Sequence, residues 1–136
     1  MPKRPVAKSA VALWIAQSVL AALFLFAGGS KLAMSIATLA HASTMSPVFL
    51  KFIGVCEIAG ALGLVLPGLF RVKTFLTPLA AAGLVIIMIG ATVVTATSPA
   101  PAGATFPLAI GILCAVVAIG RRPVRVHANP ALAQAA

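Results

Sequence analysis

Glu57 is the only acidic residue in the sequence, and it stands in the middle of a long apolar run. If that run spans a bilayer, an ionised group at this depth costs about a few kcal/mol, so it normally faces other helices and has a partner. Lys31 and Lys51 are the two candidate partners. Two interpretations stay open: a proton-carrying or ligand-binding group, or a structural contact between two helices.

The composition of the chain places it in a lipid bilayer. Hydrophobic residues make up 62% of the sequence and charged residues 8%, and the mean hydropathy is +1.16. Soluble domains have on average roughly 45–50% hydrophobic residues and about 25% charged residues. About 20 apolar residues form a helix that crosses the hydrocarbon layer. The apolar runs lack the alternation of barrel strands. We therefore predict an all-α fold, an integral membrane four-helix bundle over residues 9–120. Its helices are expected at about 9–28, 48–66, 75–95 and 102–120.

Prolines and glycines indicate where these helices end. Pro67 and Gly68 are expected to close the second helix, because proline cannot continue the hydrogen-bond ladder. The start of the fourth helix is open between Ala100 and Phe106. Residues 29–47 form the longest connection, in which apolar residues recur at helical spacing. This connection is either a short surface helix that covers a cavity or a partly ordered loop.

The ten Lys and Arg residues, which give a net charge of +9, predict the orientation. Only Lys31 and Lys51 fall on one side of the predicted bundle, and the other eight fall on the opposite side. Because cytoplasmic segments are enriched in Lys and Arg, both termini are expected in the cytoplasm: a basic segment over 1–8 and a basic, then Ala-rich tail over 121–136. The eight residues are Lys3, Arg4, Lys8, Arg71, Lys73, Arg121, Arg122 and Arg125.

This distribution predicts a multi-pass protein of the cytoplasmic membrane. It does not fit nucleic-acid binding, which needs one clustered basic face with stacking aromatics. A cleaved signal peptide is an alternative interpretation of the first apolar run, but signal cores usually have only about 7 to 15 residues.

Several reaction types are disfavoured by the residues present. A glycosidase needs two carboxylates, and this sequence has one. Three apolar runs separate His41 from His127, which places the two imidazoles on opposite sides of the membrane and disfavours a shared metal site. Cys56 and Cys114 stand in apolar runs, where cysteine usually acts as a small hydrophobic residue. We expect no metal, no cofactor and no catalysis by the chain alone.

Small residues mark the faces on which the helices are expected to pack. Gly54 and Gly60 lie on the same helical face as Glu57, and Gly83 and Gly90 lie on one face of the third helix. Small side chains allow helices in membranes to approach closely. These four glycines, together with Gly28 at the end of the first helix, are therefore predicted to lie at helix contacts.

Three segments resemble the DoxX-like family of small four-helix bacterial membrane proteins: AGGSKL (27–32), IGVCEIAGALGLVLPG (53–68) and AAAGLVIIMIGA (80–91). The resemblance extends from about Phe24 to Gly120. It implies that the family's motif positions are taken by Gly28, Lys31, Gly54, Glu57 and Gly60.

The sequence departs from the family at one position. Many relatives have a histidine a few residues after the Gly-Ala pair, and here Thr95 or Ala96 stands in its place. A relay or ligand site that uses that imidazole is therefore in doubt. The resemblance implies a range of roles: a subunit associated with thiosulfate or quinone oxidation, membrane complexes with redox-protective enzymes, or a chaperone-like function.

Two hypotheses follow for the function. The first is an accessory membrane subunit that docks a membrane or redox protein partner and has no turnover alone. The alternative is a redox-linked membrane protein that binds a quinone or small lipophilic ligand near Glu57. Small-molecule transport has less support, because no pair of discontinuous helices is evident. Whether the chain forms homo-oligomers stays open.

Overall fold

The computed structural model describes residues 6–122, with side chains from residue 9 onward, and within this part the chain is helical without strands. Four of its segments are long and apolar enough to cross a membrane. At about 1.5 Å per residue, the two central helices are roughly 31 to 35 Å long, which matches the hydrocarbon layer. The predicted all-α, four-helix membrane architecture is confirmed. The elements are α1 (Val6–Ala33), α2 (Ile36–Ala42), α3 (Pro47–Leu69), α4 (Leu76–Ala96), the 3-10 turn η1 (Pro101–Ala104) and α5 (Thr105–Gly120).

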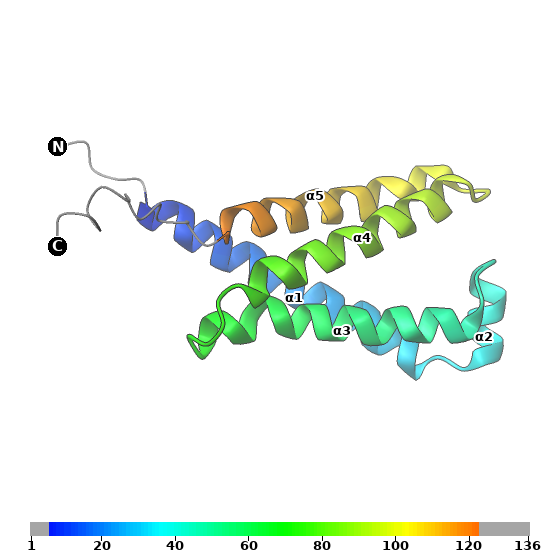
Figure 1. Ribbon diagram of the computed structural model, residues 1–136. Helices are drawn as coiled ribbons and strands as arrows, with labels where there is room; N and C mark the ends of the chain where they lie inside the picture. The colour runs from blue at the N-terminus through cyan, green and yellow to red at the C-terminus, as the bar shows by residue number, and fades with distance from the viewer. Residues whose placement is uncertain (1–5, 123–136) are drawn as a thin grey trace, which may run out of the picture.

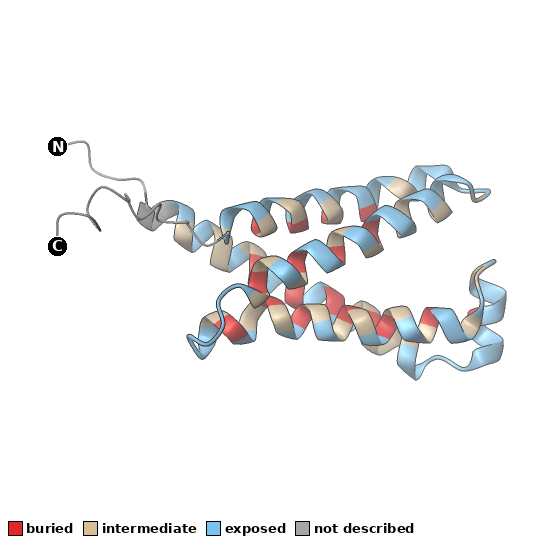
Figure 2. Cartoon of the chain, in the orientation of Figure 1, coloured by how far each residue is buried: buried red, intermediate tan, exposed pale blue. Residues whose placement is uncertain are grey.

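The long helices form two antiparallel hairpins. Helix α1 packs along α3, and α4 packs along α5. The hairpins meet near the α3–α4 connection, here named the connection end, and diverge toward the opposite end, here named the α2 end (Figure 1). The core lies mainly where the hairpins meet (Figure 2). Its members are Leu20, Ala21, Phe24, Ala61, Leu64, Ala81, Leu84, Met88, Ile110, Cys114 and Val117.

Helix α1 is longer than predicted and continues to Ala33 instead of ending at Gly28. The Ser30 hydroxyl donates to the Ala27 carbonyl oxygen within the helix (2.9 Å). The Lys51 amine donates to the carbonyl of Leu32 (3.0 Å), one of the last-turn carbonyls that a helix end leaves without partners. The helix end is therefore satisfied from α3, and Lys31 becomes part of the helix.

The prediction that Pro67 and Gly68 close the second helix is wrong, because the helix ends slightly later than predicted. Pro67 lies inside α3, which continues to Leu69. A proline near the end of a helix removes only one hydrogen bond. The helical hydrogen bonds continue after Pro67: the Phe70 amide donates to the Leu66 carbonyl (2.9 Å).

The remaining boundaries lie close to the predicted ones. Helix α4 begins at Leu76, one residue later than expected, and the fourth span begins with η1 at Pro101, inside the range left open. The long connection contains α2, whose N-cap Ser35 accepts a hydrogen bond from the Thr38 amide (3.2 Å). Leu39 is its buried residue. The helical interpretation of this segment is therefore confirmed.

The described cations follow the predicted distribution in part. Arg71 and Lys73 lie in the α3–α4 connection, and Arg121 and Arg122 follow α5 at the same end of the bundle. The other cations assigned to this side lie outside the residues with described side chains; they are Lys3, Arg4, Lys8 and Arg125. The cytoplasmic placement of the termini stays a prediction.

Candidate functional site

The backbones of α1 and α3 cross closely at two glycines. A Cβ atom at Gly28 would stand 2.6 Å from the Gly54 carbonyl oxygen, and one at Gly54 would stand 3.0 Å from the Gly28 carbonyl oxygen. Each glycine therefore directs a Cα hydrogen at the carbonyl of the other helix, a contact typical of close helix packing. The crossing fixes the register of the hairpin.

This crossing brings the two charged residues together. Lys31 follows Gly28 by three residues and Glu57 follows Gly54 by three, and residues at this spacing share one helical face. The Lys31 Nζ donates to both carboxylate oxygens of Glu57, at 3.0 Å to Oε1 and 2.8 Å to Oε2. The pair lies near the middle of α3, because Glu57 is the eleventh residue of its 23.

The two partners of the ion pair differ in exposure. The Glu57 side chain is 3% exposed, whereas the Lys31 side chain is 27% exposed. Lys51, the other predicted candidate, instead bonds the Leu32 carbonyl at the end of α1. The structure therefore selects Lys31 as the partner of Glu57 and leaves the Lys31 side chain as the more accessible member of the pair.

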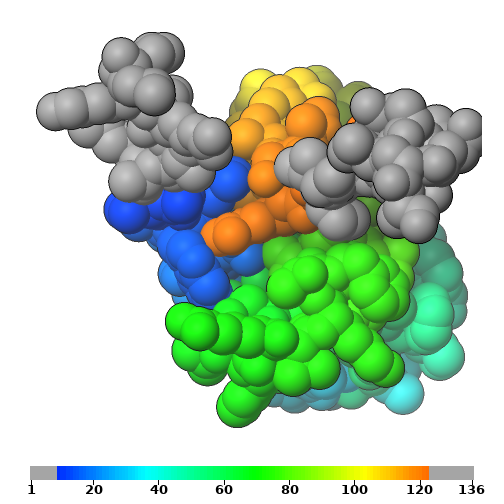
Figure 3. All heavy atoms as spheres, turned by 60° about the vertical axis from the view of Figure 1, so that its left-hand side comes forward, coloured from blue at the N-terminus to red at the C-terminus, as the bar shows by residue number. Residues whose placement is uncertain are grey.

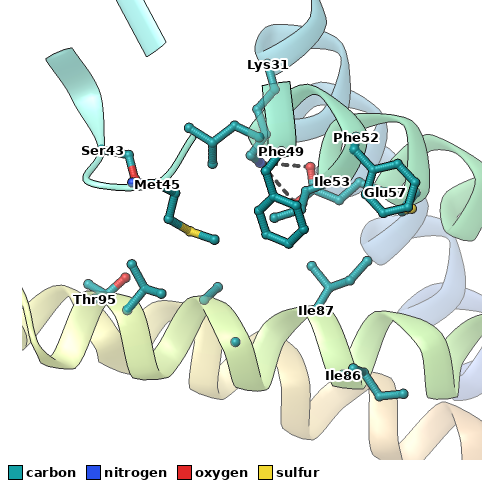
Figure 4. A pocket seen from close by; sticks show the side chains of 15 residues that line it. Lys31, Ser43, Met45, Phe49, Phe52, Ile53, Glu57, Ile86, Ile87 and Thr95 are labelled. Carbon is teal, nitrogen blue, oxygen red and sulfur yellow. Dashed lines mark hydrogen bonds and ion pairs between the residues drawn. The ribbon is translucent and has the colours of Figure 1, made fainter. Parts of the chain in front are cut away.

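A cavity of about 390 Å³ lies beside the ion pair, where α3 and α4 diverge (Figure 4). Its walls are mainly apolar. Phe49 and Phe52 line it from α3 with ring centroids 6.3 Å apart, and Ile87 and Gly90 line it from α4. The complete lining is Lys31, Ser43, Met45, Phe49, Leu50, Phe52, Ile53, Cys56, Glu57, Ile86, Ile87, Gly90, Ala91, Val94 and Thr95.

A second, more polar cavity adjoins the first at the α2 end. It has a volume of about 630 Å³ and shares Ser43, Val94 and Thr95 with the apolar cavity. His41, at the end of α2, also lines it. Thr95 therefore belongs to the wall between the polar mouth and the apolar interior.

The five predicted packing glycines fall into two groups. Gly28 and Gly54 lie at the α1–α3 crossing, and at Gly60 a Cβ would stand 2.7 Å from the Leu84 side chain of α4. At Gly83 and Gly90 a Cβ would meet no atom within 4 Å. Within the described chain these two glycines therefore take no part in a close helix contact, and Gly90 instead lines the apolar cavity.

Both cysteines are free thiols on different helices. Cys56 lies in the wall of the apolar cavity. Cys114 of α5 is fully buried in the hydrophobic core between the helices. Within residues 6–122, the His, Cys and Glu side chains form no group that could hold a metal ion.

Sequence reasoning missed one polar cluster. Gln17 of α1 is 1% exposed, its amide nitrogen donates to the Leu64 carbonyl, and its amide oxygen accepts a hydrogen bond from Arg121 (2.7 Å). The signal was available, because Gln17 is a lone amide in an otherwise apolar run. The charge distribution along the sequence predicts only a topological role for Arg121.

Comparison with protein families assigns most of the chain to one family. Residues 15–117, well over half of the sequence, match the family described as the DoxX-like family. This range contains both Gly-x-x-Lys and Gly-x-x-Glu motifs, the ion pair and the apolar cavity. No curated protein and no solved structure matches the chain. Four spanning segments with a charged pair between them, together with this match, lead to one conclusion: the chain is a multi-pass membrane protein and belongs to the DoxX-like family.

Proposed function

We propose that the protein binds a small lipophilic molecule with a hydrogen-bond-accepting head group, such as a quinone, in the cavity between α3 and α4. The observation that carries the proposal is the Lys31 ammonium at the wall of this cavity. An ammonium has three N–H donors. Two of them bond to Glu57, and the third has no partner among the described residues.

The cavity supports this assignment by its size and lining. Ligand sites in proteins usually have volumes of roughly 300–1,000 Å³ and apolar walls with a few polar groups that orient the ligand; this cavity has about 390 Å³. A carbonyl or hydroxyl oxygen of the ligand would accept from Lys31, and an aromatic head would contact Phe49 and Phe52. Glu57 holds the ammonium in place and balances its charge.

The two glycines of α4 with open space offer a matched test. Gly90 lines the cavity and Gly83 does not, and at both positions an added Cβ atom would meet no atom within 4 Å. Decylubiquinone, titrated into the protein in dodecyl maltoside, is expected to raise the melting temperature in a saturable manner. Gly90→Leu fills part of the cavity, so it is expected to weaken binding about 10- to 100-fold. This loss of affinity corresponds to the usual energetic cost of forcing extra methylene groups into a packed space.

Gly83→Leu is the control and is expected to bind decylubiquinone as the unchanged protein does. The double variant Lys31→Met/Glu57→Gln keeps the cavity and removes its charged wall, so it is expected to lose the melting shift. Equal shifts in the Gly90→Leu and Gly83→Leu proteins would show that the quinone associates elsewhere, for example with the lipid-facing surface.

The accessory role expected from the sequence, with docking to a membrane or redox protein of the cytoplasmic membrane, is a second proposal. Its support is membership of the DoxX-like family, for which the resemblance implies membrane complexes with redox-protective enzymes. Purification from native membranes in a gentle detergent, followed by mass spectrometry, is expected to recover one stoichiometric partner. Recovery of the chain alone at several detergent concentrations would contradict this role.

A further inference from the structure

A second polar cluster lies at the connection end, far from the Lys31–Glu57 pair, and joins three helices. Gln17 of α1 donates to the Leu64 carbonyl of α3 and accepts a hydrogen bond from the Arg121 Nε. The guanidinium carbon of Arg121 lies 5.2 Å from the centroid of the Trp14 ring, within the range of a cation–π contact. These contacts fix the position of the guanidinium group.

Most of the hydrogen-bonding capacity of Arg121 is unused. An arginine has five N–H donors, and among the described residues only the donor on Nε has a partner. The Nη2 atom is buried and has no hydrogen-bond partner, which is costly for a charged group. The only acidic side chain of the sequence, Glu57, is already bonded to Lys31. No acidic side chain is left to serve as the counterion.

Arg121 lines a cavity of about 260 Å³ together with other polar residues. Among them is Thr77, which is 3% exposed and whose hydroxyl has no partner in the described chain. Thr77 lies in the first turn of α4, where the helix dipole favours negative charge. Since a water molecule takes up about 30 Å³, the cavity has room for a small polyatomic anion. The remaining lining residues are Gln17, Gly68, Thr74, Gly120 and Arg122.

We propose that this cavity binds a phosphate-type anion, either the phosphate of a phospholipid headgroup or free inorganic phosphate. The unused guanidinium donors of Arg121 match the oxygens of a phosphate group, and the Thr77 hydroxyl supplies a further donor. Arg121 directly follows the fourth spanning segment and Thr77 is the second residue of the third, which places these two anion-binding residues near the level of the lipid headgroups. Figure 3 shows this end of the molecule, with the end of α5 between the start of α1 and the α3–α4 connection.

Trp14 is the only tryptophan in the sequence, so its fluorescence reports directly on this cluster. The protein is prepared in dodecyl maltoside, which contains no phosphate, and is titrated at constant ionic strength with dioleoyl phosphatidylglycerol, sodium phosphate or dioleoylglycerol. A saturable change in Trp14 emission is expected with a phosphate-bearing ligand and not with dioleoylglycerol. A change with phosphatidylglycerol alone assigns the anion to the lipid headgroup, and a change with sodium phosphate assigns it to the free ion.

Variants test which residues hold the anion. Arg121→Gln is expected to shift the titration midpoint about 50-fold or more and Thr77→Val about tenfold, as expected for hydrogen bonds to a charged group. Thr77→Val keeps the shape of the side chain, so it remains a test even where Arg121→Gln prevents folding. Arg71→Gln removes a cation of the same connection end that does not line the cavity, and its midpoint is expected to be unchanged. An unaltered midpoint in both Arg121→Gln and Thr77→Val, or an equal response to dioleoylglycerol, would overturn the proposal.

Discussion

Replacing Lys31 with methionine is expected to destabilise the protein far more than replacing Lys31 and Glu57 together. Lys31→Met leaves the Glu57 carboxylate, 3% exposed, without its partner inside the membrane. Removing one member of a buried ion pair costs about 3–5 kcal/mol, whereas replacing both with neutral residues of similar size is often close to neutral. We therefore expect Lys31→Met/Glu57→Gln to recover most of the stability. The free energy of unfolding is measured by denaturation with sodium dodecyl sulfate in mixed micelles.

Glu57→Gln completes the double-mutant cycle and is expected to cost less than Lys31→Met, because the Lys31 side chain is 27% exposed and keeps access to the cavity. Lys51→Met is the matched control. It removes a lysine whose amine bonds only the Leu32 carbonyl among the described residues, so a loss of about 0.5–1.5 kcal/mol is expected. A double variant as unstable as Lys31→Met would contradict the coupling between the two charges.

Substitution by alanine is expected to affect the two adjacent glycines of α1, Gly28 and Gly29, very differently. At Gly28 an added Cβ would stand 2.6 Å from the Gly54 carbonyl oxygen, a backbone atom that can move away only if the helices separate. Gly28→Ala is therefore expected to lower the free energy of unfolding by about 3 kcal/mol, the upper part of the overpacking range. At Gly29 an added Cβ meets nothing within 4 Å, so Gly29→Ala is expected to be neutral or to stabilise the helix by up to about 1 kcal/mol.

The same detergent denaturation measures both variants, and decylubiquinone binding provides a second readout. Since Gly28 sets the register of Lys31 against Glu57, Gly28→Ala is also expected to weaken quinone binding, while Gly29→Ala leaves it unchanged. Similar stabilities for the two variants would mean that α1 and α3 are not in close backbone contact at this point.

The four spanning segments could be predicted because each is a long apolar run, and the bilayer leaves helices as the main solution for such runs. The importance of Glu57 was also visible, since a lone acid among apolar residues stands out in any composition. The choice between Lys31 and Lys51 was not visible. It depends on the register of α1 against α3, which is set by the Gly28–Gly54 crossing and not by either helix alone.

Helix ends and glycine roles were harder to predict for a related reason. The continuation of α1 to Ala33 depends on a hydrogen bond supplied by Lys51 from another helix. Gly60 and Gly83 are both glycines in apolar helices, yet only Gly60 lies against a neighbouring side chain. Periodicity shows which residues share a face, but the partner of that face is decided by tertiary packing. For the same reason, the position of Arg121 in the sequence could not predict that most of its guanidinium donors are unused.

The order of the helices along the chain has a consequence for biogenesis. Lys31 and Glu57 belong to α1 and α3 of the same hairpin, so both charges have been synthesised before α4 and α5 are translated. Each charge alone would make insertion less favourable, but the nascent hairpin already contains its own neutralising contact. The ion pair can therefore form as α1 and α3 leave the translocon, before the second hairpin is translated.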